Sequence, residues 1–266
     1  MTADTRHIDT RRVGDATVTV ISEGGLLWEA RFPAPEAEWR RAMPEADAEG
    51  RVWLGLNVVI VRLGEALIVI DPGLDEPDSD WQRRRAEVWP NWPMRRTAGL
   101  AAALGELGID PAEVTHVVIT HPHGDHYAGV VAEREGGFVP RFPNARHVMG
   151  RADWEGNPGR AEPGTDLVRL EVIDRLGLLE LVDEAREIAP GVTLLPAPGE
   201  SPGHIVVKLE SGEDVLYLLG DVVHHACEVE QITWGPPHAD AEALLTTRRR
   251  LFAEAARENA LVITAH

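Results

Sequence analysis

Short apolar runs rich in β-branched residues recur along the chain, and turn-forming Gly, Pro and Asp residues end them. Such runs predict strands at residues 16–22, 56–63, 66–70, 116–120, 146–149, 192–196, 205–209, 215–219 and 260–264. Apolar residues at helical spacing predict helices over residues 97–108, 166–179 and 239–259. Because the strands come in two batches with helices between them, the pattern predicts an α/β protein in which helices face two sheets.

Two stretches, residues 24–51 and 75–96, have no regular pattern and exceed the usual connection length of about 12–15 residues. They are expected to be functional loops or partly helical insertions. Their aromatic residues are interpreted as half-buried anchors in preference to walls of a pocket, although either role suits a large aromatic ring. These residues are Trp28, Phe32, Trp39, Trp81, Trp89 and Trp92.

The composition is that of a soluble globular protein, since 44% of the 266 residues are hydrophobic and 26% are charged. No internal repeat or break in composition marks a boundary, so residues 1–266 are expected to form one domain. The 44 acidic and 26 basic residues give a formal charge of −18, which repels nucleic acid and anionic membranes. A small molecule is therefore the expected partner, with neither nucleic acid nor membrane, and a homodimer stays open.

Cys227 is the only cysteine, which excludes an intrachain disulfide and a cysteine-rich structural zinc site. Residues 1–12 are polar and of mixed charge, unlike the apolar segment of a secretory signal. No segment approaches the roughly 18 apolar residues that cross a membrane as a helix. Together these features predict a cytoplasmic protein.

The run THPHGDH, residues 120–126, directly follows a predicted strand and holds three imidazoles and one carboxylate. A strand that ends and turns here can direct His121 and His123 to one point, and Asp125 and His126 to a neighbouring one. Imidazole nitrogen and carboxylate oxygen are ligands that zinc and similar divalent ions prefer. The run therefore predicts a site for two divalent metal ions.

The order of elements and this run resemble the metallo-β-lactamase superfamily of metallohydrolases. The family's loop H-x-H-x-D-H matches His121, His123, Asp125 and His126 without a gap, and the resemblance spans nearly the whole chain. It implies an αββα sandwich of two mixed sheets flanked by helices, with a two-metal site along one edge.

The segment APGESPGH, residues 197–204, resembles the family's glycine-rich turn except that Glu200 replaces a histidine, the third ligand of the first metal. We interpret Glu200 as a substitute ligand, and a carboxylate there would favour iron or manganese more than three histidines do. Two alternatives stay open: the first site is weak or empty, or His204 takes the place of Glu200. In the family, the position of His204 usually supports the ligands from behind.

Two later residues complete the resemblance. Asp221, at the end of a predicted strand, matches the aspartate that bridges both metals, and His266 matches the histidine that completes the second site. Family members usually continue past this histidine, so we expect that the sequence lacks a short C-terminal segment.

Two residues are candidates for a direct catalytic role. Asp125 could direct the proton of the attacking water through its second oxygen. His224 stands three residues after Asp221, where the acyl-homoserine-lactonase branch has a tyrosine that assists the substrate carbonyl. We expect His224 to assist the oxyanion or the leaving group.

The resemblance implies a metal-dependent hydrolase with two divalent ions, for which zinc is expected, or iron or manganese at the Glu200 site. The acidic surface argues against nuclease branches, and an approach lined by tryptophan suits a neutral lactone or ester. The nearest branches would be quorum-quenching lactonases and organophosphate hydrolases. The alternative is a metal-binding scaffold that has lost efficient hydrolysis through Glu200.

The remaining histidines and a basic run are interpreted as surface or structural residues. His7, His116, His147 and His238 lie apart from any partner in the sequence, so a surface or structural role is expected. The run of three arginines at residues 248–250 is interpreted as the solvated face of a helix.

Overall fold

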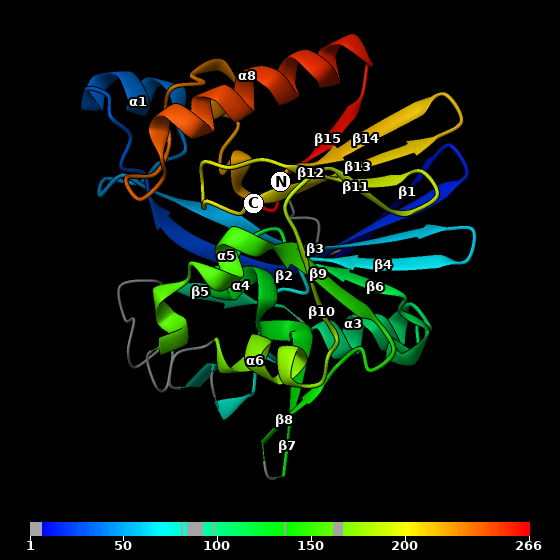
Figure 1. Cartoon of the computed structure of the whole chain (residues 1–266). Helices are drawn as coiled ribbons and strands as arrows, with labels where there is room; N and C mark the ends of the chain where they lie inside the picture. Colours follow the sequence, from blue (N-terminus) through cyan, green and yellow to red (C-terminus); the bar gives the residue numbers. More distant parts are fainter. Residues whose placement is uncertain (1–6, 81, 84–92, 98, 136, 162–166) are drawn as a thin grey trace.

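In the part of the chain that the structure describes, two large β-sheets pack together with helices on their outer faces (Figure 1). The computed structural model describes residues 7–80, 82–83, 93–97, 99–135, 137–161 and 167–266. Trp81, Trp89 and Trp92 therefore lie outside the described residues.

The first sheet holds eight strands in the described part of the chain, and it is mixed. Its first four strands are antiparallel, and the next pairings, β4 with β6, β6 with β9 and β9 with β10, are parallel. The order is β1 (Ile8–Val13), β2 (Ala16–Glu29), β3 (Arg51–Leu63), β4 (Ala66–Ile70), β6 (His116–Val118), β9 (Arg146–Gly150) and β10 (Leu179–Val182), with β5 (Met94–Arg96) paired to β2.

The second sheet is also mixed, since only its last pair of strands is parallel. Its order is β11 (Arg186–Ala189), β12 (Val192–Pro196), β13 (Ile205–Ser211), β14 (Asp214–Leu218) and β15 (Leu261–Ile263). A separate hairpin is formed by β7 (Val131–Arg134) and β8 (Gly137–Pro140).

The described helices are mostly short. They are α1 (Glu36–Ala42), α3 (Leu100–Glu106), α4 (Gly124–Tyr127), α5 (Arg151–Glu155), α6 (Val168–Arg175), α7 (Cys227–Glu230) and α8 (Ala241–Arg257). Single 3-10 turns occur at Pro111–Glu113, Ala128–Val130, Pro158–Ala161 and Gly220–Val222. Within the described residues, no helix has both the length and the apolar character to cross a membrane.

Side chains that alternate between the two faces of a strand connect the layers of the fold. In β4, Leu67 and Val69 pack in a core with Leu100 of α3, whereas Ile68 and Ile70 pack in the core between the sheets. Successive side chains of a strand point to opposite faces, so one strand serves two cores. Figure 1 shows α3 and α6 on one side of the paired sheets and α8 on the other.

The second sheet alternates in the same way. Leu216 and Leu218 of β14 join the core between the sheets, while Tyr217 packs in a third core with Leu244 and Leu251 of α8. The predicted αββα sandwich of two mixed sheets is therefore confirmed.

Several predicted boundaries were wrong. The stretch 24–51 is not irregular throughout, because β2 extends to Glu29, β3 begins at Arg51, and α1 lies between them. The register shifts between Ser22 and Gly24, and this bulge in β2 interrupts the alternation that would have marked a longer strand. The predicted helix 166–179 is described as α6 over Val168–Arg175, and Leu179 already begins β10.

The carboxyl ends of five strands meet at one edge of the sandwich. β4 is parallel to β6, and β14 is parallel to β15. β12 runs in the same direction as β14, because each is antiparallel to β13 between them. The residues that follow these strands are therefore brought to one place.

Candidate metal centre

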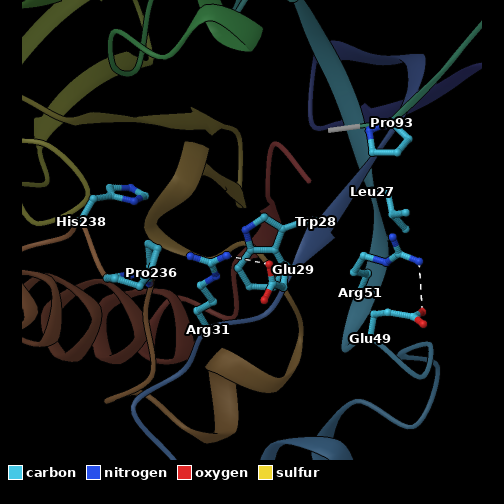
Figure 2. A pocket seen from close by; sticks show the side chains of 10 residues that line it. Leu27, Trp28, Glu29, Arg31, Glu49, Arg51, Pro93, Pro236 and His238 are labelled. Atoms are coloured by element: carbon cyan, nitrogen blue, oxygen red, sulfur yellow. Dashed lines mark hydrogen bonds and ion pairs between the residues drawn. The ribbon is translucent and has the colours of Figure 1, made fainter. Parts of the chain in front are cut away.

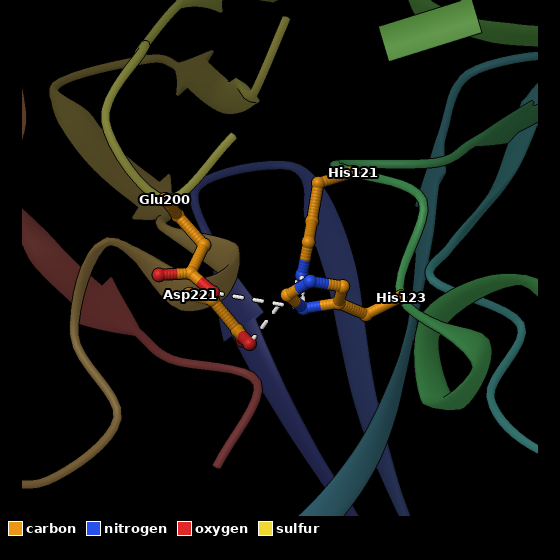
Figure 3. Close-up of side chains that lie close together, drawn as sticks. All are labelled: His121, His123, Glu200 and Asp221. Carbon is orange, nitrogen blue, oxygen red and sulfur yellow. Dashed lines mark hydrogen bonds and ion pairs between the residues drawn. The ribbon is translucent and has the colours of Figure 1, made fainter. Parts of the chain in front are cut away.

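Four side chains form a first cluster of metal-binding atoms, and they point toward one another (Figure 3). They are His121, His123, Glu200 and Asp221, with one ligand atom of each within 4.8 Å of the others. His121 Nε2 lies 2.8 Å from His123 Nδ1 and 3.5 Å from Asp221 Oδ2. His123 Nδ1 lies 3.6 Å from Glu200 Oε1.

Asp125, His126 and His266 form a second cluster, again within 4.8 Å. Asp125 Oδ2 lies 3.8 Å from Nε2 of His126 and 3.8 Å from Nε2 of His266. The sequence run thus splits as predicted: its first two histidines lie in one cluster, and Asp125 and His126 lie in the other.

Asp221 lies between the two clusters. Its Oδ2 is 3.3 Å from His126 Nε2, and its Oδ1 is 3.3 Å from His266 Nε2. Burial alone would raise the pKa of Asp221, but the surrounding imidazoles, with His126 and His266 foremost, hold it well below its usual range. The carboxylate is therefore ionised and faces both clusters.

Asp71 orients two of the histidines from behind. It follows β4 with a left-handed φ of 47°, and its carboxylate accepts hydrogen bonds from Thr120 N and Thr120 Oγ1, both at 2.8 Å. Asp71 Oδ2 also lies 2.9 Å from His126 Nδ1, and Thr120 Oγ1 lies 3.0 Å from His121 Nδ1. When these Nδ1 atoms donate, the Nε2 lone pairs of both rings point into the centre.

His266 is oriented by the main chain. Its Nδ1 lies 2.7 Å from the carbonyl oxygen of Gly55, which leaves Nε2 toward Asp221. The preceding residue, Ala265, accepts hydrogen bonds from the backbone and side-chain amides of Asn57 at 3.2 and 3.0 Å. The end of the chain is thus held against β3.

His224 lies beside Asp221, as its spacing in the sequence suggests. Its Nε2 is 3.3 Å from Asp221 Oδ2 and 3.8 Å from Glu200 Oε1. Its ring is stacked between Trp28, at 6.0 Å, and His266, at 5.8 Å. Burial opposes a charge on this ring, yet Asp221 and the other carboxylates raise the pKa of His224 well above its usual range.

A buried ion pair lies behind His224. Glu228 Oε2 is 3.8 Å from His224 Nδ1 and contacts the guanidinium of Arg248. Both Arg248 and Glu228 are fully buried, so the predicted solvated face was wrong for Arg248, whereas Arg249 and Arg250 are exposed. Arg248 also donates to the carbonyl of Val222, which ties α8 to the segment that carries Asp221.

Two further histidines flank this centre. His204 is buried, and its Nε2 accepts a hydrogen bond from the backbone amide of Asp221 at 3.3 Å, so it lies behind the aspartate. His238 does have a partner, contrary to the prediction: its Nε2 lies 2.5 Å from Glu200 Oε1. The contact has no local signal in the sequence because 38 positions separate the two residues.

A cavity of about 720 Å³ opens beside the centre. Trp28 and His238 both line it: Trp28 stacks on His224, and His238 contacts Glu200 of the first cluster. Figure 2 shows His238 and Pro236 on one side of the cavity and Arg51 and Glu49 on the other. Trp28 thus forms a wall of the cavity. Phe32 is buried in an apolar cluster, and Trp39 is partly buried against that cluster.

The donor atoms fit divalent cations. His126 Nε2, Glu200 Oε2 and Asp221 Oδ1 are buried and have no hydrogen-bond partner among the described residues. Buried polar atoms normally have partners, so unpaired nitrogen and oxygen atoms gathered in one place are the arrangement expected where a cation binds. Burial lowers the pKa of His121 well below its usual range, which keeps its ring neutral and able to ligate.

Besides His238, three groups that support the candidate ligands or His224 were not predicted from the sequence. Asp71 directly follows the predicted strand 66–70, and an aspartate at the end of a strand is the signal that could have found it. The carbonyl of Gly55 and the carboxylate of Glu228 carry no signal in the sequence, because nothing local distinguishes them.

Comparison with known proteins gives a family match and several similar folds. The model of the metallo-beta-lactamase superfamily matches residues 51–266. The N-acyl homoserine lactonase AttM of Azorhizobium caulinodans is 36% identical over 139 residues, which are 48% of this chain and 49% of that protein. The chain thus spans about half the length of this curated relative.

Two solved structures have similar folds at low identity. A probable metal-dependent hydrolase from Staphylococcus aureus gives a TM-score of 0.81 at 20% identity, covering 96% of this chain and 91% of that one. AidC, described as a dizinc quorum-quenching lactonase in complex with a product, gives a TM-score of 0.77 at 20% identity, covering 97% of this chain and 90% of that one.

Proposed function

The chain belongs to the metallo-beta-lactamase superfamily, and we propose that it is a metal-dependent hydrolase that opens lactone or ester bonds in small neutral molecules. The observation that carries this proposal is Asp221, a buried carboxylate shared between two clusters of metal-binding atoms. The names of the relatives support the substrate class, since they include an N-acyl homoserine lactonase and a dizinc lactonase.

This fold implies divalent metal ions, and we assign the ligands by cluster. The first cation would be held by His121, His123 and Glu200, and the second by Asp125, His126 and His266, with Asp221 between them. Zinc suits both donor sets, and the Glu200 carboxylate makes the first site harder and better suited to iron or manganese. Since both sheets contribute to this one site, we also propose that residues 1–266 form one domain.

Cations bound here would supply Lewis acidity, which polarises a carbonyl and lowers the pKa of water. The protein supplies the rest of the chemistry. The imidazoles of His126 and His266 hold the pKa of Asp125 below its usual range despite burial, so its carboxylate is ionised. Its Oδ2 faces those two rings, so we assign Oδ1 the role of accepting the proton of the attacking water.

We assign His224 the role of assisting the oxygen of the substrate carbonyl or the leaving group. Its Nε2 is beside Asp221, and its flat ring forms a stack with Trp28 at the cavity. A proton on Nε2 can be donated to the oxygen that develops charge as the ring opens. Trp28 and the neighbouring walls would exclude water from this face of the substrate.

The scaffold alternative is not favoured, because Glu200 lies with the other candidate ligands and the relatives carry the names of active hydrolases. A metal count beside a hydrolysis screen tests the choice. We expect about two equivalents of zinc or manganese per chain, with ring opening of N-acyl homoserine lactones that is lost in chelator-treated protein and regained with metal. One equivalent or less, with no turnover of lactones or activated esters, would overturn the proposal.

A further inference from the structure

His238 stands where the cavity meets the first cluster. It lies in the segment between α7 and α8, its side chain is 51% exposed, and it lines the cavity. Its Nε2 nevertheless reaches inward to Glu200 Oε1, and its ring lies 5.3 Å from that of His123. His238 is thus a half-exposed residue whose inner edge contacts a fully buried carboxylate.

Glu200 is held differently from the candidate ligands His126 and His266. His126 and His266 each have a second ring nitrogen against a buried oxygen atom. The second oxygen of Glu200, Oε2, has no hydrogen-bond partner in the described part of the chain. Glutamate also has more rotatable bonds than histidine, so it loses more freedom when it is fixed. The contact with His238 is the hydrogen bond that the structure gives the Glu200 side chain.

The main chain ties the two residues together. The backbone amide of Asp240 donates to the carbonyl of Gly199 at 2.8 Å, so the segment before α8 is anchored to the residue before Glu200. Asp240 also caps α8, because its carboxylate accepts from the amides of Glu242 and Ala243. Gly199 has a φ of 146°, and a side chain there would collide with Leu244 of the helix.

We propose that His238 is a positioning residue that holds Glu200 on the first cation. It does for a carboxylate ligand what Asp71 does for His126. The inference rests on the proposed role of Glu200 as a ligand. Partners that orient ligands typically change metal affinity by roughly 10- to 100-fold when they are removed. This chain therefore uses a pair, Glu200 with His238, where the family pattern has a single histidine.

The test is a titration of the full chain with cobalt or zinc against a competing chromophoric chelator. We expect His238→Ala to weaken the first-site cation by roughly 10- to 100-fold and to change the cobalt absorption spectrum. His238→Gln, whose amide can still donate to the carboxylate, should restore most of that affinity. The matched control is His225→Ala, because His225 forms the same kind of pair, with Glu45 at 2.6 Å, outside both clusters.

The variant Glu200→Gln separates the role of Glu200 as a ligand from the role of His238 as its positioning residue. We expect it to weaken the first-site cation, and we expect Glu200→Gln combined with His238→Ala to bind no more weakly than Glu200→Gln alone. If Glu200→Gln loses affinity and His238→Ala does not, the inference is overturned while the ligand set stands. If the two losses add, His238 acts independently of Glu200 and the inference is also overturned. Unchanged affinity in Glu200→Gln would overturn the ligand set itself.

Discussion

The two halves of the metal centre are built differently, although Asp221 is common to both. In the second half, His126 and His266 each have their outer ring nitrogen against a buried oxygen, from Asp71 and Gly55. In the first half, the His123 side chain is 42% exposed, and Glu200 is held by the half-exposed His238. In the first half only His121 is supported from behind, through Thr120, and Glu200 is held from the side of the cavity.

This difference shows how one site can bind metal firmly and still admit a substrate. A ligand whose partner is buried keeps its orientation before the cation arrives, so less freedom is lost on binding. A ligand beside a cavity leaves room for a substrate group. We therefore expect the second-half cation to bind more tightly than the first-half cation, and the four changes below test that contrast.

The largest effect is expected from Asp221→Asn, because it alters the one ligand that belongs to both halves. Loss of several kcal/mol of charge stabilisation corresponds to a fall in kcat/KM on the order of 1000-fold. Metal content should fall below two equivalents at the same time. Kinetics and elemental analysis check this, with Asp174→Asn on the exposed side of α6 as the control. A fall of less than about tenfold would show that the halves work without a shared carboxylate.

A second change tests Glu23, which supports the turn after Asp71 in the second half of the centre. Glu23 is buried under the turn that follows Asp71, where its Oε2 accepts from the amide of Leu74 at 2.7 Å. Burial raises the pKa of Glu23 to about 7, although Arg96 acts in the other direction. The unfolded chain ionises this group near 4.5, so it binds fewer protons than the folded chain between pH 4.5 and 7. Stability from this group is full below that window and is lost as the pH rises through it.

Glu23→Gln should remove that pH dependence. Relative to the variant, the metal-free wild-type chain should lose about 3 kcal/mol of unfolding free energy between pH 5 and pH 8. Urea unfolding at a series of pH values measures the difference. Parallel curves for the two proteins would mean that Glu23 does not hold a proton in the folded state.

A third change removes an orienting partner in the second half. Asp71→Asn should weaken the second-half cation most, by roughly 10- to 100-fold, because His126 contacts this carboxylate directly whereas His121 is reached only through Thr120. The mirror experiment is His238→Ala, which should weaken the other cation. Competition titrations of both variants check the contrast. If both variants weakened the same cation most, the division into two separately supported halves would be wrong.

The smallest effect is expected at the cavity wall. Trp28→Ala removes the ring that stacks on His224, a contact of the kind worth about 0.5–1.5 kcal/mol. KM for an apolar lactone should rise by about 2- to 12-fold, with little change in metal affinity. Trp53→Ala is the control, since Trp53 is 40% exposed on β3 and does not line this cavity. Equal effects of the two variants would remove Trp28 from the substrate path.

The sequence predicted the sandwich because most of its strands are apolar runs that serve two cores. β1 and β11 escaped prediction because they are edge strands whose residues are largely exposed, so they lack the alternation that burial imposes. The Trp-rich stretch around α1 also carried no regular pattern, since its single helix has no fully buried residue.

The candidate ligands were foreseeable for a different reason. Four of them fall in one contiguous run, and the others end predicted strands or lie in a glycine-rich turn. Gly55 and His238 were not foreseeable as supports, because they act through contacts between distant segments. The burial of Arg248 was unforeseeable for the same reason. This one arginine of a charged run is buried because it pairs with Glu228 and donates a hydrogen bond to a backbone carbonyl.

The most direct test is anomalous diffraction from crystals grown with zinc. We predict two peaks, one among His121, His123 and Glu200 and one among Asp125, His126 and His266, with Asp221 contacting both ions. A single peak, or an ion that Glu200 and Asp221 do not contact, would contradict it.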